Sequence, residues 1–257
     1  MISQEKQKPS KTPSGPRGKP ESVAFENLHL SIFPDVYDPH EDSFMLAKAA
    51  KELSFGKVLD LGCGSGIGGL LAIQNKKVTE ITFADISDSA LANARQNYEK
   101  NERIIAQSIG MPKGNQAIKS NPKPNRLPKP NGNPKSNSSS KPNAFFIKSN
   151  LFQKLENVKF DTILFNPPYL PTTNEEQLGG NINRAFDGGK NGRQTIAKFL
   201  LKFQQHLSQK GILLFLDSSL SDSIKTEKKL SSLGFKFEVL SLQSFFFEKL
   251  RVLKVYR

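Results

Sequence analysis

The sequence has 257 residues and a formal net charge of +13, enough chain for one large α/β domain or two small ones. Its single cysteine, Cys63, excludes an internal disulfide, and its three scattered histidines lack metal-ligand spacing, so we predict no metal site and a reducing, cytoplasmic location. No apolar run approaches the roughly 20 residues that span a bilayer, and the polar first 20 residues lack a signal-peptide core, so no membrane association is expected.

The positive charge is concentrated in two segments. Residues 1–20 carry +4 and residues 105–143 carry +7, which leaves only +2 on the other 198 residues. The second segment is rich in Pro, Asn, Ser and Lys, and it has too little apolar surface to offset roughly 1–2 kcal/mol of backbone entropy per residue. We predict a disordered basic tail at 1–20 and one domain at 21–257, interrupted by a disordered low-complexity insertion at 105–143.

Short apolar strands alternate with helical patterns along the rest of the chain. The patterns predict strands at 57–61, 79–85, 144–149, 160–165 and 211–217, and helices at 67–74, 87–101 (N-cap Ser87), 195–209 and 221–233. Two further strands, 235–242 and 245–257, follow without a helix between them. This order predicts an α/β fold with a mostly parallel seven-stranded sheet and a C-terminal antiparallel hairpin, which is the Rossmann-like class I methyltransferase architecture.

A glycine-rich loop follows the first predicted strand of this sheet. It reads Asp60-Leu-Gly62-Cys-Gly64-Ser-Gly66, and Asp85 ends the next strand nineteen residues later. Glycines allow a tight turn and close ligand approach, and Asp85 is placed to accept from ribose hydroxyls. Because an acid directly before the loop suits a cationic amino-acid group and repels a pyrophosphate, and because the spacing is GxGxG, we predict S-adenosyl-L-methionine as the cofactor.

The motif Asn166-Pro167-Pro168-Tyr169 directly follows the apolar strand FDTILF. An amide or exocyclic amine nitrogen is a weak nucleophile, because its lone pair is delocalised. Two acceptors on its N–H groups would localise that pair, and the Asn166 side chain and the Pro167 carbonyl suit this role. Tyr169 offers a ring face for a planar group. We therefore predict an N-methyltransferase with Asn166, Pro167 and Tyr169 as catalytic residues and Asn166, Pro167, Pro168 and Tyr169 as substrate-binding residues.

Four stretches of the sequence resemble the HemK-type protein-(glutamine-N5) methyltransferases, in the archaeal and eukaryotic branch that acts on class I release factors. They are VYDPHEDSFML (36–46), VLDLGCGSG (58–66), FNPPYLP (165–171) and NRAFDGGKNGRQTIAKFL (183–200). With the strands between them, they cover nearly all of residues 30–257 apart from the insertion. The NPPY motif is shared with adenine-N6 methyltransferases, whereas the first and last stretches are more specific to this branch.

The resemblance implies a role for each matching residue. Asp42 and Ser43, with Asp60 and Gly62, are expected to lie near the methionine end of the cofactor, Gly64 to contact the cofactor, and Asp85 to hold its ribose. Asn150 and Leu151 are expected to border the adenine, and Asn166 to contact both cofactor and substrate. The family usually has Asp at the position of Asn150, and because an Asn oxygen can still accept from the adenine amine, we expect weaker selectivity rather than lost binding.

The resemblance also implies the partners. The substrate would be the GGQ glutamine of a class I peptide chain release factor, with 187–193 helping to shape the pocket, and a small zinc-containing activator would pair along the edge of the third strand. The basic insertion enters that strand at Ala144, and it is either a passive linker or, like the N-terminal tail, a contact for RNA or the ribosome.

Two rival functions stay open at this point. An adenine-N6 methyltransferase of RNA or DNA would use the same NPPY motif, although the nearly neutral core lacks a basic recognition face. A non-catalytic S-adenosylmethionine-binding or RNA-binding module would explain the basic tails, but it would have no need for the acceptor on Asn166.

Overall fold

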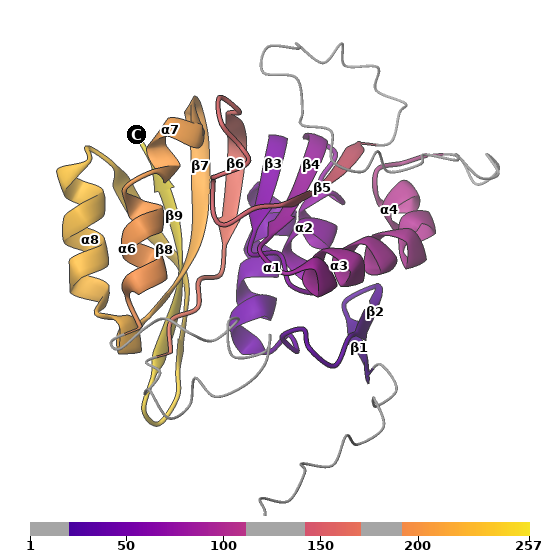
Figure 1. The fold of residues 1–257 in the computed structure, drawn as a ribbon, viewed down its shortest axis with the longest axis horizontal. Coiled ribbons are helices and arrows are strands. Elements are labelled where there is room, and N and C mark those ends of the chain that lie inside the picture. The colour runs from indigo at the N-terminus through magenta and orange to yellow at the C-terminus, as the bar shows by residue number, and fades with distance from the viewer. Residues whose placement is uncertain (1–20, 112–141, 171–191) are drawn as a thin grey trace, which may run out of the picture.

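The computed structural model describes residues 21–111, 142–170 and 192–257, and its centre is a seven-stranded sheet in the order β5-β4-β3-β6-β7-β9-β8 (Figure 1). The strands are β3 (Gly56–Leu61), β4 (Val78–Asp85), β5 (Asn143–Lys148), β6 (Phe160–Phe165), β7 (Leu207–Ser218), β8 (Lys236–Ser244) and β9 (Lys249–Tyr256). Strands β3 to β7 run parallel to one another, and β9 is antiparallel to both β7 and β8. The predicted fold class is therefore confirmed.

Helices cover both faces of this sheet. They are α1 (Glu41–Leu53), α2 (Ile67–Ala72), α3 (Asp88–Lys100), α4 (Glu102–Ser108), α6 (Gln194–Leu200), α7 (Phe203–His206) and α8 (Ser223–Ser232), with the short 3-10 helix η1 at Ser219–Ser221. The first four helices share one hydrophobic core with one face of the sheet, and α6, α7 and α8 share a second core with the other face. Strand β6 alternates between the two cores, since Leu164 belongs to the first and Ile163 and Phe165 to the second, which explains its uninterrupted apolar sequence.

An N-terminal hairpin, which the sequence patterns did not predict, packs against α3. It consists of β1 (Glu21–Phe25) and β2 (Leu28–Ile32). Three asparagines spaced four residues apart along α3 and its C-cap accept backbone N–H groups from β2 and from the residue after it: Asn93 from Phe33 at 3.1 Å, Asn97 from Ser31 at 2.8 Å and Asn101 from His29 at 3.0 Å. These side chains satisfy the free edge of β2, which otherwise would have unpaired N–H groups.

The predicted helix at 87–101 is confirmed as α3, and the side chain of Ser87 caps it by accepting from the Ala90 N–H at 3.3 Å. The predicted helix at 195–209 is wrong in its length, because it breaks into α6 and α7 and the chain joins the sheet at Leu207. Pairing of Leu207 with Phe160 of β6 supplies the backbone hydrogen bonds that a longer helix would have made.

The predicted start of the insertion at residue 105 is too early. Helix α4 continues to Ser108, and Ile105 is fully buried in the core that α3 also lines. At the other end, Asn143 already pairs with Glu80 in the sheet. Most of the predicted insertion, 112–141, and the predicted tail, 1–20, lie outside the described residues. Within the described part of the chain, no helix is long and apolar enough to span a membrane.

Candidate active site

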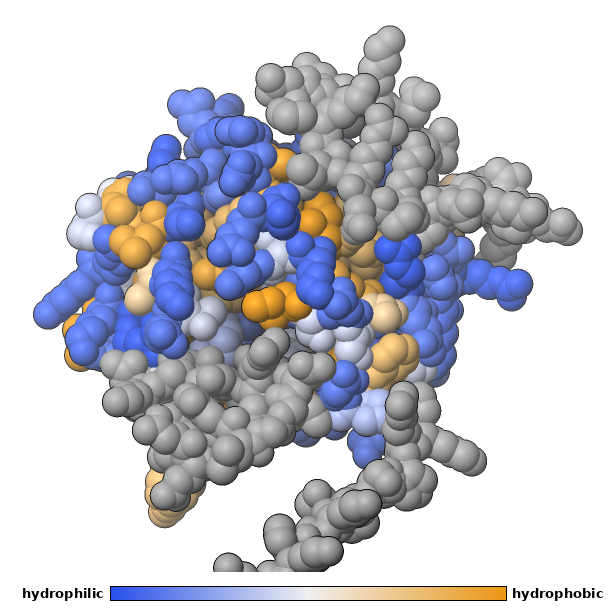
Figure 2. Space-filling view, viewed as in Figure 1, coloured by the Kyte–Doolittle hydropathy of each residue, from blue (hydrophilic) through white to orange (hydrophobic). Residues whose placement is uncertain are grey.

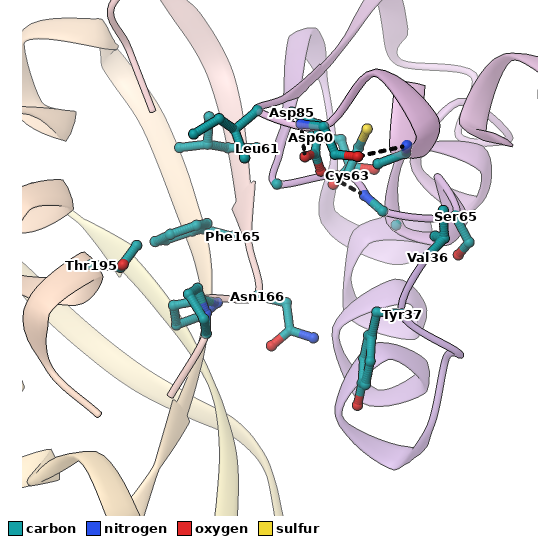
Figure 3. Close-up of a pocket in the computed structure, with 18 of the residues that line it drawn as sticks. Val36, Tyr37, Asp60, Leu61, Cys63, Ser65, Asp85, Phe165, Asn166 and Thr195 are labelled. Atoms are coloured by element: carbon teal, nitrogen blue, oxygen red, sulfur yellow. Dashed lines mark hydrogen bonds between the residues drawn. The ribbon is translucent and has the colours of Figure 1, made fainter. Parts of the chain in front are cut away.

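A cavity of about 550 Å³ lies at the carboxyl ends of the parallel strands β3, β4, β5 and β6 (Figure 3). All the residues that the sequence predicts as site residues line it: Asp42, Ser43, Asp60, Gly62, Gly64, Asp85, Asn150, Leu151, Asn166, Pro167, Pro168 and Tyr169. Ligands of doubly wound sheets bind at this edge, next to the point where the strand order changes direction. Here that point lies between β3 and β6.

The glycine-rich loop ties the end of β3 to the end of β4. Gly62 and Gly64 have φ values of 66° and 52°, in the left-handed region that glycine adopts without strain. The Gly62 N–H donates to the Ala84 carbonyl at 2.7 Å, and the Gly64 N–H donates to Asp85 Oδ2 at 3.1 Å. Because Asp85 also accepts from the Ser87 N–H at 2.9 Å, its carboxylate is held in place at the cavity wall, where burial raises its pKa.

Asp60 is a buried acid at the base of the loop. Its Oδ2 accepts the Gly69 N–H in the first turn of α2 at 2.8 Å, and burial raises its pKa to about 7. Gly69 allows this approach, since a Cβ there would come within 2.4 Å of the Phe83 ring and 3.0 Å of the Asp60 carboxylate. The acid is thus fixed in position with little stabilisation of its charge.

The loop also contains Cys63, which is buried at 6% exposure. Burial raises the pKa of its thiol further above the usual range, so the neutral form is favoured. Its side chain belongs to the core that α1, α2 and α3 share with the sheet. These features fit a small packing residue.

The turn after β5 borders the cavity beside Asp85. The Ser149 N–H donates to the Asp85 carbonyl at 2.8 Å, and the Ser149 hydroxyl donates to the Leu151 carbonyl at 2.7 Å. Leu151 has a φ of 49°, an uncommon conformation for a residue with a Cβ, and Asn150 is exposed. The two hydrogen bonds at Ser149 hold this turn against the end of β4.

Asp42, at the start of α1, has a buried carboxylate that accepts hydrogen bonds from four donor groups. It accepts from the Tyr37 hydroxyl at 3.0 Å on each oxygen, from its neighbour Ser43 N–H at 2.6 Å, from Asn166 Nδ2 at 3.0 Å and from the Tyr169 hydroxyl at 3.4 Å. Burial, followed by the charge of Asp42, raises the pKa of both tyrosines, so both stay protonated donors. Asp42 therefore joins α1 to the NPPY segment after β6.

This carboxylate determines how the Asn166 amide is oriented. An ionised carboxylate only accepts hydrogen bonds, so the NH₂ group of Asn166 must face Asp42 and its Oδ1 must face elsewhere. That oxygen is buried and has no partner among the described residues. Figure 3 shows the Asn166 side chain extending from the end of β6 toward the side of the cavity where Tyr37 lies. A buried acceptor without a donor is costly, which indicates that a ligand donor belongs there.

Sequence reasoning assigned no role to several cavity residues. Tyr37 belongs to the stretch 36–46 that resembles the family, but only its hydrogen bond to Asp42 shows that it is part of the site. Gln194, Thr195 and Lys198 of α6 also line the cavity, on the side of Phe165. Of the predicted stretch 187–193, residues 187–191 lie outside the described residues. Arg193 packs away from the cavity, donating to the Ser221 carbonyl at 2.6 Å and to Thr226 Oγ1 at 2.8 Å.

These features fit S-adenosylmethionine. No cationic side chain in the described part of the chain pairs with Asp60, Asp85 presents a fixed carboxylate one strand away, and the glycines leave room beside both. Sheet, loop and cavity together define a class I S-adenosylmethionine-dependent methyltransferase.

Comparisons with known proteins agree with this class and give the family. Residues 39–120 match the family model described as methyltransferase small domain. A putative protein N5-glutamine methyltransferase of Methanocaldococcus jannaschii is 31% identical over 235 residues, which are 91% of this chain and 98% of that protein. The chain therefore belongs to the HemK-type protein N5-glutamine methyltransferase family.

Two further matches extend this result. The eRF1 methyltransferase catalytic subunit mtq2 of Schizosaccharomyces pombe is 25% identical over 205 residues, 72% of this chain and 73% of that protein. The structure of E. cuniculi Mtq2 in its Mtq2–Trm112 complex superposes with a TM-score of 0.55 over 87% of this chain and 99% of that one, at 20% identity. The second match supports the fold alone.

Proposed function

We propose that this chain transfers a methyl group from S-adenosylmethionine to the side-chain amide nitrogen of a glutamine, the GGQ glutamine of a class I peptide chain release factor. The observation that carries the proposal is the buried Oδ1 of Asn166 beside Asp42, which has no hydrogen-bond partner among residues 21–111, 142–170 and 192–257. Membership of the family and relatives whose names include eRF1 and release factor methyltransferases support the substrate. Such a substrate would place the chain in the cytoplasm.

The cofactor would lie across the carboxyl ends of β3, β4 and β5. Asp60 would hold its ammonium group, with Gly62, Gly64 and Ser43 close by, and Asp85 would accept from the ribose hydroxyls. Asn150 and Leu151 would border the adenine. When bound, the cofactor supplies an electrophilic methyl group on a sulfonium, and the residues of this chain orient the nucleophile.

The NPPY segment would prepare the amide nitrogen of the substrate. Asn166 Oδ1 accepts one amide N–H and the Pro167 carbonyl accepts the other, which localises the nitrogen lone pair and directs it at the methyl group. Tyr169 packs against the planar amide. The nitrogen would gain the methyl group as the S–CH3 bond of the sulfonium breaks to leave a thioether, and it would lose one of its two protons to water, which would give a secondary amide.

Asp42 would act as a positioning residue in this scheme. If the Asn166 amide rotated by 180°, its NH₂ group would meet the substrate NH₂, and donor would face donor. The 3.0 Å hydrogen bond from Asn166 Nδ2 to Asp42 prevents this, and the Tyr37 and Tyr169 hydroxyls keep the carboxylate in place. The acceptor is thus pre-organised before substrate binds.

A small activator protein is the second part of the proposal. The E. cuniculi relative is described as a complex with Trm112. In this chain β5 is an edge strand, with Phe145 only partly buried, and a partner strand could pair with it. We extend the proposal to a zinc-containing activator on this edge and to an RNA or ribosome contact through the basic segments.

The test is a mass-spectrometric assay with isotopically labelled cofactor. The cognate release factor and its GGQ→GGA variant are offered with and without a Trm112-like protein. One methyl group on the glutamine, absent from the variant, is expected. Transfer to RNA or DNA adenine, with none to the release factor, would replace the proposal with the adenine-N6 reading, since two acceptors suit an exocyclic amine equally well.

A further inference from the structure

The turn between β8 and β9 exposes three consecutive phenylalanines. Phe245, Phe246 and Phe247 are 41%, 92% and 82% exposed, and the rings of the last two meet edge to face with centroids 4.5 Å apart. The Phe245 N–H closes the turn by donating to the Glu248 carbonyl at 2.7 Å. In Figure 2, apolar atoms stand out at the lower end of the molecule, where Figure 1 places this turn. Rings this exposed indicate a contact surface.

The turn lies at the same edge of the sheet as the cavity. Phe165, which precedes Asn166, pairs with Phe215 of β7, and Ser218 at the end of β7 pairs with Leu250 of β9. Since β9 is antiparallel to β7, the turn that precedes β9 extends beyond this carboxyl edge.

Glu248 connects the turn to the NPPY segment. The Ser218 hydroxyl donates to Glu248 Oε1 at 2.5 Å, which fixes the carboxylate beside the end of β7. After burial and Asp42, the charge of Glu248 also raises the pKa of Tyr169, so the two side chains lie close enough to interact. The phenylalanines therefore lie outside the cavity lining but on the same carboxyl rim of the sheet, with β9 two strands from β6 and its proposed acceptor.

A second exposed apolar site joins this rim. Leu220 in η1 is 38% exposed and Ile224 at the start of α8 is 63% exposed. Their segment is tied to the turn, because the Lys249 N–H donates to Ser219 Oγ at 2.9 Å. We call Leu220, Ile224 and Phe245–Phe247 the rim patch.

We infer that the rim patch is the docking surface for the substrate protein, with Phe246 and Phe247 inserted into its apolar surface next to the methylated residue. This inference rests on the proposed function. A residue of a folded protein enters the cavity from a chain that leaves it on both sides, so the substrate must cover the rim during the reaction. A permanent dimer through the same turn would obstruct that approach.

The first test measures binding without transfer. Calorimetry with S-adenosylhomocysteine present compares the release factor affinity of the wild-type chain, the Phe246→Ser/Phe247→Ser double variant and a Val239→Ser/Leu240→Ser control. The control residues are 46% and 37% exposed on β8, away from the turn. The rim variant is expected to raise the Kd about tenfold or more, as loss of aromatic anchors does, and the control to leave it unchanged.

The second test measures transfer to the whole release factor and to a short peptide that contains only the GGQ loop. The rim variant should lose kcat/KM about tenfold on the whole protein through KM and keep the wild-type value on the peptide. Equal losses on both, an unchanged Kd, no binding by the wild type, or a dimer in light scattering that the variant dissociates would each overturn the docking surface. Binding that depends on the phenylalanines without methyl transfer would support docking and refute the proposed function.

Discussion

Asp60 should release a proton when the cofactor binds. Its pKa is about 7 in the free protein because burial disfavours the carboxylate and only the Gly69 N–H stabilises it among the described residues. An ammonium group beside it would lower that pKa by one to three units. At pH 6.5 about three-quarters of the free protein holds the proton, so binding should release about 0.5 to 0.8 proton.

Calorimetry in two buffers of different ionisation enthalpy measures this release directly. At pH 6.5 the cofactor α-amine, with an ordinary pKa of about 7.7–8.0, is already charged and contributes little. Asp60→Asn keeps an acceptor for Gly69 and removes the titrating group. Equal proton release by wild type and variant would refute the assignment of Asp60 to the cofactor cation.

The raised pKa of Asp60 should also make the stability of the folded protein depend on pH. Between the ordinary value of 3.8 and about 7, the folded protein binds more protons than the unfolded chain, so the free energy of unfolding falls as pH rises through this window. The loss is at most about 4 kcal/mol, from 1.36 kcal/mol for each unit. At pH 8 and without cofactor, Asp60→Asn should therefore melt higher than wild type while binding the cofactor more weakly, and a lower melting temperature would contradict the reasoning.

Four other substitutions separate the proposed roles. Asn166→Ala should lower kcat about 100-fold or more with cofactor affinity unchanged in calorimetry, and near-normal turnover would exclude the acceptor role. Asp42→Asn should lower kcat about 10- to 100-fold, because the Asn166 amide loses its fixed orientation, and unaltered kcat would show that the orientation is set elsewhere. Asp85→Ala should weaken cofactor binding in the same assay, and unchanged affinity would refute the ribose contact. Asn97→Ala should lower the free energy of unfolding, measured in urea, by about 1–3 kcal/mol, because the Ser31 N–H loses its acceptor, while kcat stays normal. An unfolding free energy equal to that of the wild type would contradict the structural role of this asparagine.

Local sequence patterns predicted those parts of the site that lie in single strands and the turns directly after them. The glycine loop and Asp85 follow from two consecutive strands and their turns, and the NPPY motif follows directly from β6. The N-terminal hairpin could not be predicted in this way. Strand β2 (LHLSI) does alternate apolar and polar residues, but each strand is only five residues long, and Asn93, Asn97 and Asn101, which hold β2, follow it in the chain by more than 60 residues.

The contact that orients the Asn166 amide also joins residues that are far apart in the chain, so local patterns could not predict it. Asp42 and Asn166 are 124 residues apart in the chain and meet only because α1 packs at the carboxyl edge of the sheet. The resemblance of the sequence to the family placed Asp42 near the methionine end of the cofactor. The contacts add a second role for it, since they join it to the acceptor.

The two buried acids of the cavity can be distinguished by the donors that surround them. Asp42 already has Tyr37, Tyr169, Asn166 and a backbone N–H, so its charge is satisfied before any ligand arrives. Asp60 has one backbone donor among the described residues and a pKa raised to about 7. A cation would gain little by approaching Asp42, whereas it would restore the charge of Asp60. The hydrogen bonds therefore favour orientation of the acceptor as the role of Asp42 and binding of the cofactor cation as the role of Asp60. If the cation bound at Asp42 instead, Asp42 would have more partners than its charge needs, and the buried charge of Asp60 would stay uncompensated.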